Sequence, residues 1–112
     1  MSRQLGDAAE SRAVAYLTGL GYEILDRNFT CKMGELDIVA KQGDTVVFVE
    51  VKSRAGSKFG LAQETVVASK RRKLLRAAQL YVQLRNLDCP LRFDVIADGP
   101  DGLEHFENAF DG

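Results

Sequence analysis

The chain has 112 residues, of which 46% are hydrophobic and 28% charged, and its net charge is −1 at pH 7. This length and composition predict one globular domain over residues 1–112 and exclude a disordered chain. No apolar run approaches the roughly 18 residues of a membrane span, and the N-terminal residues lack the apolar core of a signal peptide. We therefore expect a cytoplasmic protein that does not contact a membrane.

Cysteine and histidine content excludes two common kinds of site. The two cysteines, Cys31 and Cys89, give no disulfide framework and are expected to be reduced thiols. A structural zinc site needs about four Cys or His ligands, and the only histidine is His105. The isolation of His105 near the C-terminus also argues against a serine or cysteine nucleophile with a histidine base.

Basic residues are concentrated in one segment. From Lys52 to Arg76 there are eight basic residues and one acidic residue, so this segment carries +7 and the rest of the chain −8. Such asymmetry predicts one face for a polyanion such as DNA. The alternative is a basic helix face that is only solvated. The residues expected to meet phosphates are Arg54, Lys70, Arg71, Arg72, Lys73 and Arg76.

The first half of the chain predicts one helix followed by three strands. Apolar residues recur at helical spacing over about 2–19, and Gly21 can end this helix in a left-handed conformation. Segments rich in Val, Ile and Phe predict strands at 22–29, 36–41 and 45–52. The apolar stripe of the helix consists of Leu5, Ala9, Ala13, Tyr16, Leu17 and Leu20.

The second half predicts a loop, a long helix and two more strands. After a loop with Gly56 and Gly60, a helix is expected over about 69–86, and strands are expected at 91–97 and 103–110. The apolar stripe of this helix would be Leu74, Ala78, Tyr81, Val82 and Leu84. The order αβββαβ, with a further strand at the end, predicts an α/β fold with a mixed central sheet flanked by helices.

Two of the predicted strands bring charged residues together. We suppose that Gly43-Asp44 forms the two-residue loop of a type II′ hairpin. Opposed residue numbers then sum to 87, so that Asp37 faces Glu50 and Glu35 faces Lys52. Directly opposed side chains share a face, with Cβ atoms about 4.5–5.5 Å apart. Four ionisable groups are therefore predicted at one end of one face.

The remainder of this hairpin is apolar on both faces. On the face of the charged group the expected residues are Val39, Val46 and Phe48. On the opposite face they are Leu36, Ile38, Val47, Val49 and Val51. A buried hairpin with a charged group at one end is what an active site on a rigid scaffold requires.

Opposed carboxylates at Asp37 and Glu50 need compensation, because like charges repel and burial disfavours the ionised form. A divalent cation removes both difficulties, and two carboxylates with waters and substrate phosphate oxygens suit Mg²⁺. Lys52 projects to the same side, where it can orient or deprotonate an attacking water or stabilise charge on a phosphate. The alternative is a cross-strand ion-pair network in which Glu35 pairs with Lys52 and the other two carboxylates are solvated.

Further motifs extend this pattern over nearly the whole chain. They are 34–40 (Gly-Glu-Leu-Asp-Ile-Val-Ala), 48–54 (Phe-Val-Glu-Val-Lys-Ser-Arg) and 92–96 (Arg-Phe-Asp-Val-Ile), with Glu10 and the segment 107–110. In these residues the sequence resembles the YraN-like family of bacterial proteins. That family is similar to archaeal Holliday-junction resolvases within the PD-(D/E)XK, restriction-endonuclease-like superfamily, which implies a restriction-endonuclease-like αβββαβ core.

The resemblance implies a role for each residue of the charged group. Asp37 would be the motif aspartate, Glu50 the second acidic ligand and Lys52 the motif lysine of a catalytic set. Glu10 would match the acidic residue that resolvase-like nucleases bring to the metal, and its alternative is a solvated helix glutamate. A main-chain carbonyl near Val51 is a further candidate ligand for Mg²⁺ or Mn²⁺.

The implied activity is metal-dependent hydrolysis of DNA phosphodiester bonds, with branched or otherwise unusual DNA as a candidate substrate. The sequence departs from the superfamily pattern at Leu36, in place of a proline, and at Lys70, where related nucleases often have a glutamine. One alternative is a non-catalytic nucleic-acid-binding module, and another is an interaction domain that uses only the fold. A domain of this size engages a short stretch of duplex, so symmetric cutting of two strands would need a homodimer.

Overall fold

The computed structural model describes residues 2–53 and 68–109. Its elements are α1 (Ser2–Gly19), β1 (Glu23–Cys31), β2 (Gly34–Gln42), β3 (Thr45–Ser53), α2 (Ala68–Arg85), β4 (Leu91–Gly99) and β5 (Gly102–Phe106). This order confirms the predicted αβββαβ arrangement with one further strand. The predicted loop containing Gly56 and Gly60, and the candidate phosphate-binding Arg54, lie outside the described residues.

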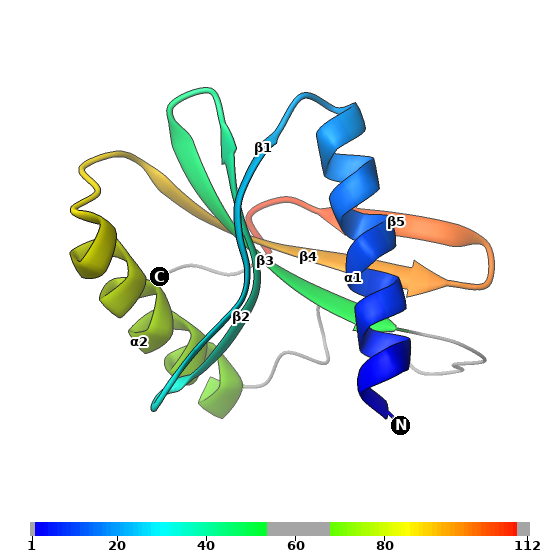
Figure 1. Cartoon of the computed structure of the whole chain (residues 1–112), viewed down its shortest axis with the longest axis horizontal. Coiled ribbons are helices and arrows are strands. Elements are labelled where there is room, and N and C mark those ends of the chain that lie inside the picture. Colours follow the sequence, from blue (N-terminus) through cyan, green and yellow to red (C-terminus); the bar gives the residue numbers. More distant parts are fainter. Residues whose placement is uncertain (1, 54–67, 110–112) are drawn as a thin grey trace.

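One five-stranded sheet, in the order β1-β2-β3-β4-β5, forms the centre of the fold. β3 and β4 run parallel, whereas the other neighbouring strands run antiparallel, so the sheet is mixed as predicted. Figure 1 shows α1 on one side of this sheet and α2 on the other. The protein therefore has an α/β fold, and its architecture is compatible with a restriction-endonuclease-like core.

Each helix covers a separate apolar cluster on its own face of the sheet. The cluster under α1 consists of Ala13, Leu17, Tyr22, Ile38, Ala40, Val47, Val49 and Ile96. The cluster under α2 consists of Leu36, Val39, Val46, Phe48, Leu74, Ala77, Ala78, Tyr81, Phe93, Val95 and Ala97. Both faces of β2 and β3 are therefore buried, so the two helices hold this pair of strands from both sides.

The ends of several elements differ from the prediction. Gly21 adopts the expected left-handed conformation, with φ of 95°, but Leu20 just before it is exposed. Leu84 is also exposed, because it lies in the last turn of α2. Both residues were therefore wrongly assigned to apolar stripes. β5 ends at Phe106, earlier than predicted, since Asn108 has a positive φ of 52° and turns the chain back toward β4.

The strict alternation of side chains fails at one point in β2. Ile38 packs under α1 as expected, but Leu36 packs under α2, so its predicted face is wrong. Asn28 lies between two residues of β1 that pair with Ile38 and Leu36, and it has a positive φ of 56°. The sheet is therefore irregular on both strands beside Asp37, as is common next to functional sites.

Candidate active site

The hairpin of β2 and β3 has the predicted register. Its pairs run from Gln42↔Thr45 to Ile38↔Val49, and every pair sums to 87. Gly43 has a φ of 62°, as the first position of a type II′ turn requires. This register sets Asp37 and Glu50 side by side, directly beyond the last pair of the ladder.

Beyond the pair Ile38↔Val49, the side chain of Asp37, and not a further main-chain pair, connects β2 to β3. Its Oδ2 accepts a hydrogen bond of 2.9 Å from the main-chain nitrogen of Val51. A carboxylate that binds the N–H of a neighbouring strand must lie close to the plane of the sheet. Asp37 is therefore positioned between the two layers that α1 and α2 form, where groups from both helices can reach it.

The surroundings of Asp37 disfavour its ionised form. Burial and the negative charge of Glu50 raise the pKa of Asp37 to about 8, and the charge of Glu10 on α1 adds to this effect. The hydrogen bond from Val51 opposes the shift but does not cancel it. The raised pKa of Asp37 thus follows first from burial and then from the negative charges of Glu50 and Glu10.

Two lysines contact the same oxygen of Glu50. Lys70 Nζ lies 2.5 Å and Lys52 Nζ 3.4 Å from Glu50 Oε2. Burial lowers the pKa of Lys52, and the neighbouring Lys70 lowers it further. Burial would also lower the pKa of Lys70, but its contact with Glu50 raises it overall. The predicted opposition of Glu35 to Lys52 is not part of the β2–β3 ladder, and the ammonium of Lys52 lies against Glu50, whereas the alternative was an ion pair with Glu35.

The acidic residue from α1 also reaches the site. Glu10 is buried, and its Oε1 lies 3.9 Å from Arg27. Within residues 2–53 and 68–109, no three Asp, Glu, His or Cys side chains are arranged to hold a metal ion. Two adjacent carboxylates still fit Mg²⁺ or Mn²⁺, because Mg²⁺ usually keeps several waters and takes one or two protein carboxylates. The expected contributions of Glu10 and the Val51 carbonyl stay predictions.

A small cavity lies behind Glu50, under α2. Its volume is about 10 Å³, which is room for about one water molecule. It is lined by Leu36, Asp37, Phe48, Val49, Glu50, Leu74, Phe93 and Asp94. Because most of this lining is apolar, the Glu50 carboxylate relies on the two lysines for its compensation.

The basic residues of α2 do not all behave alike. Lys70 turns inward to Glu50, whereas Arg71, Arg72, Lys73 and Arg76 are exposed. A groove of about 420 Å³ continues along this helix beside the turn between β1 and β2, and it is lined by Met33, Arg76, Gln79, Leu80 and Gln83. The basic side chains of α2 thus begin with Lys70 at Glu50 and continue over the exposed surface of the helix.

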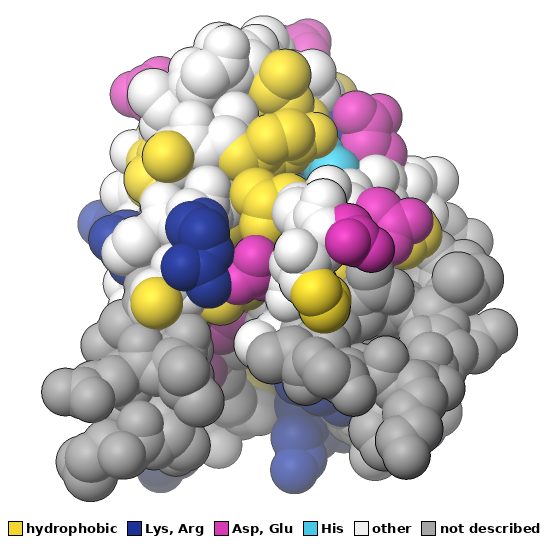
Figure 2. Space-filling view, turned by 90° about the vertical axis from the view of Figure 1, so that its right-hand side faces the viewer, with side chains coloured by type: hydrophobic (Ala, Val, Ile, Leu, Met, Phe, Trp, Pro, Cys, Tyr) yellow, Lys and Arg dark blue, Asp and Glu magenta, His cyan; other side chains and the backbone are white. Residues whose placement is uncertain are grey.

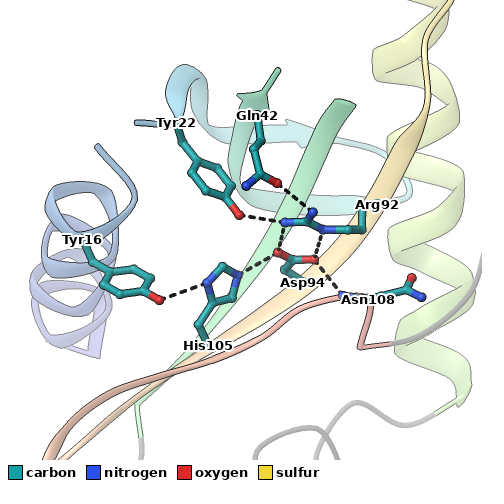
Figure 3. Close-up of polar contacts among 7 residues, drawn as sticks. All are labelled: Tyr16, Tyr22, Gln42, Arg92, Asp94, His105 and Asn108. Carbon is teal, nitrogen blue, oxygen red and sulfur yellow. Dashed lines mark hydrogen bonds and ion pairs between the residues drawn. The ribbon is translucent and has the colours of Figure 1, made fainter. Parts of the chain in front are cut away.

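The sequence pattern did not predict a buried polar network at β4, which Figure 3 shows. Arg92 donates two hydrogen bonds of 2.9 Å to Asp94, His105 Nε2 lies 2.7 Å from the same carboxylate, and the main-chain nitrogen of Asn108 donates to it. Burial would raise the pKa of Asp94, but these partners together hold it below its usual range. Asp94 is fully buried and its contacts are satisfied, so it acts as a structural anchor for β5.

The side of the molecule formed by α1 and β5 has a different character. Figure 2 shows hydrophobic and acidic side chains around the histidine on this side. The exposed acidic residues near β5 are Asp101, Glu104 and Glu107. Acidic side chains thus gather near β5, on a side of the molecule where Figure 2 also shows Lys or Arg side chains.

None of the described helices is long and apolar enough to cross a membrane. A model of the family described as "Uncharacterised protein family UPF0102" matches residues 9–97, which include Glu10, Asp37, Glu50, Lys52 and Lys70. A UPF0102 protein of Caldicellulosiruptor saccharolyticus is 50% identical over 95 residues, covering 84% of this chain and 80% of its own length. UPF0102 proteins of Symbiobacterium thermophilum and Thermodesulfovibrio yellowstonii are 46% and 43% identical, covering 98% and 96% of each chain. The predicted relationship to the YraN-like proteins is thereby confirmed at the level of the family, and the chain belongs to the UPF0102 family.

Proposed function

We propose that this protein is a divalent-metal-dependent nuclease that hydrolyses DNA phosphodiester bonds. The observation that carries the proposal is a pair of carboxylates, the buried Glu50 and the half-buried Asp37, set side by side directly beyond the last pair of the β2–β3 ladder. Two neighbouring carboxylates repel each other and destabilise the fold. A protein that only binds nucleic acid does not require such a pair. The proposal assigns the site to the PD-(D/E)XK type and includes branched DNA as a candidate substrate.

Mg²⁺ or Mn²⁺ is the cofactor that this donor set would accept. Asp37 and Glu50 would hold the ion, with Glu10 and the Val51 carbonyl as further candidate ligands. The bound ion would polarise the scissile phosphate and lower the pKa of a coordinated water. Lys52 would place its ammonium group against the charge that develops on the phosphate.

DNA is expected to approach from the α2 side. The exposed cations there are Arg71, Arg72, Lys73 and Arg76, and the opposite side of the molecule carries acidic side chains. Lys73 and Arg76, three residues apart, lie on one face of the helix, and such cations neutralise phosphates and supply affinity that is independent of sequence. A non-catalytic nucleic-acid-binding module is the second candidate function, since this surface would serve binding equally well.

A cleavage screen decides between these two functions. The purified protein is incubated with single-stranded, duplex, flap and four-way DNA in Mg²⁺, in Mn²⁺ and in EDTA. We expect cleavage that requires the metal and that is lost in Glu50→Gln, because this change removes the charge that holds the ion. If no substrate is cut, or if Glu50→Gln cuts as well as the wild type, the nuclease proposal fails and the nucleic-acid-binding function takes its place.

Salt dependence of DNA binding tests the basic surface separately from cleavage. Replacing Lys73 and Arg76 with alanine removes two exposed cations from α2, so the slope of log affinity against log salt should fall by about 0.9 for each phosphate that the variant no longer neutralises. Binding is measured on a short duplex in EDTA, by fluorescence anisotropy over a series of salt concentrations. Lys41→Ala, an exposed change at the far end of β2, is the control. A slope equal to that of the wild type would mean that α2 is only a solvated helix.

A further inference from the structure

Among the residues that the structure describes, Lys70 is the cation closest to Glu50. It projects from the first turns of α2 across to β3, where its ammonium lies 2.5 Å from Glu50 Oε2. The Glu50 side chain is only 7% exposed, and Lys52 contacts the same oxygen from 3.4 Å. One of the two oxygens that Glu50 could offer to a metal is therefore already engaged by two ammonium groups.

Three carboxyl groups and three cationic groups of the described residues meet at the site. The carboxylates are Asp37, Glu50 and Glu10, and the cations close to them are Lys52, Lys70 and Arg27. A divalent cation would add two positive charges within a few ångströms of these groups, where the repulsion is weakly screened. The ion would therefore compete directly with the ammonium groups that contact Glu50.

Lys70 is the cation best placed to leave. Its side chain is 38% exposed, compared with 24% for Lys52, and it is held from a helix and not from the central strand. A long lysine side chain can move its ammonium into water at little cost in free energy. Lys52 lies on β3, the strand that also carries Glu50, so this strand fixes its position relative to Glu50.

We infer that Lys70 is a built-in counter-ion, which occupies Glu50 in the metal-free protein and gives it up when a divalent cation binds. This inference rests on the proposed metal site. It predicts that the metal alone binds weakly, because binding must displace the ammonium from Glu50. Once displaced, the ammonium is available to a phosphate of the nucleic acid beside the ion, so the same lysine serves both states.

Calorimetric titration of the protein with Mn²⁺ alone tests this competition. Lys70→Gln removes the charge but keeps a polar side chain, and we expect it to bind Mn²⁺ about tenfold more tightly than the wild type. The same variant should have a lower melting temperature in EDTA, because Asp37 and Glu50 lose part of their compensation. Lys70→Arg keeps the charge and should bind like the wild type.

A matched control comes from the next turn of the same helix. Lys73→Gln removes an exposed charge that does not contact Glu50, so Mn²⁺ affinity should not change. Equal or weaker Mn²⁺ binding by Lys70→Gln relative to the wild type would overturn the counter-ion role while leaving the metal site in place. Absence of Mn²⁺ binding in the wild type and in every variant would overturn both the counter-ion role and the metal site of the proposed function.

Discussion

Replacing Lys52 with alanine is expected to slow DNA cleavage by about two to three orders of magnitude. The ammonium of Lys52 lies at the carboxylate pair, 3.4 Å from Glu50 Oε2, so it would face negative charge that grows on the phosphate during the reaction. An interaction made mainly in the transition state lowers the rate of the chemical step when it is removed, with little effect on binding. DNA affinity should therefore stay close to that of the wild type.

Single-turnover cleavage with the protein in excess measures the expected loss directly. Product release does not limit the rate under these conditions, so the comparison isolates the chemical step. Lys41→Ala, which removes an exposed cation at the far end of β2, is the control and should cut at the wild-type rate. If Lys52→Ala cuts as fast as the wild type, Lys52 has no catalytic role, and Lys70 becomes the cation to test next.

The register of the β2–β3 hairpin could be predicted because short-range chemistry determines it. Gly43 provides the positive φ of the turn, and two apolar faces allow only one alignment of the strands. Once the register is known, the adjacency of Asp37 and Glu50 follows from the numbering alone. The second helix was predicted with similar success, since its apolar residues recur at helical spacing.

Other features depend on long-range contacts that no local pattern contains. The placement of Leu36 under α2 follows from the irregular backbone at Asp37, whose carboxylate replaces a main-chain contact with β3. Lys70 reaches Glu50 only because α2 packs over β3, and the sequence shows it simply as one residue of a basic run. The alternative of a merely solvated basic face is therefore excluded for Lys70, whereas DNA binding by its neighbours stays a prediction.

The Asp94 network shows a third limit. The spacing of Arg92 and Asp94 puts both side chains on one face of a strand, which is a detectable signal for an ion pair. The partners His105 and Asn108 come from the other side of the β4–β5 turn, and only the folded chain brings them to Asp94. His105 thus has a structural role as a partner of Asp94.

Asp37 is expected to lower the stability of the metal-free protein as the pH rises. Its pKa is raised from an ordinary 3.8 to about 8 in the folded state, so the folded protein binds a proton that the unfolded chain has released between these values. Its contribution to the free energy of unfolding is therefore most favourable below about pH 4 and falls until about pH 8. The full shift would correspond to about 6 kcal/mol at about 1.4 kcal/mol per pH unit, which is a ceiling because Lys70 and Glu50 respond to the same charge.

Asp37→Asn keeps the shape of the side chain and an oxygen for the Val51 N–H, but it cannot ionise. In EDTA at pH 9 we expect this variant to be more stable than the wild type by about 1–3 kcal/mol, with the difference vanishing near pH 4. Added Mn²⁺ should stabilise the wild type and leave the variant nearly unchanged, since the carboxylate that holds the ion is gone. Urea unfolding at several pH values, with and without Mn²⁺, measures both effects. A stability difference that does not depend on pH would show that Asp37 ionises normally, and equal stabilisation of both proteins by Mn²⁺ would place the metal elsewhere.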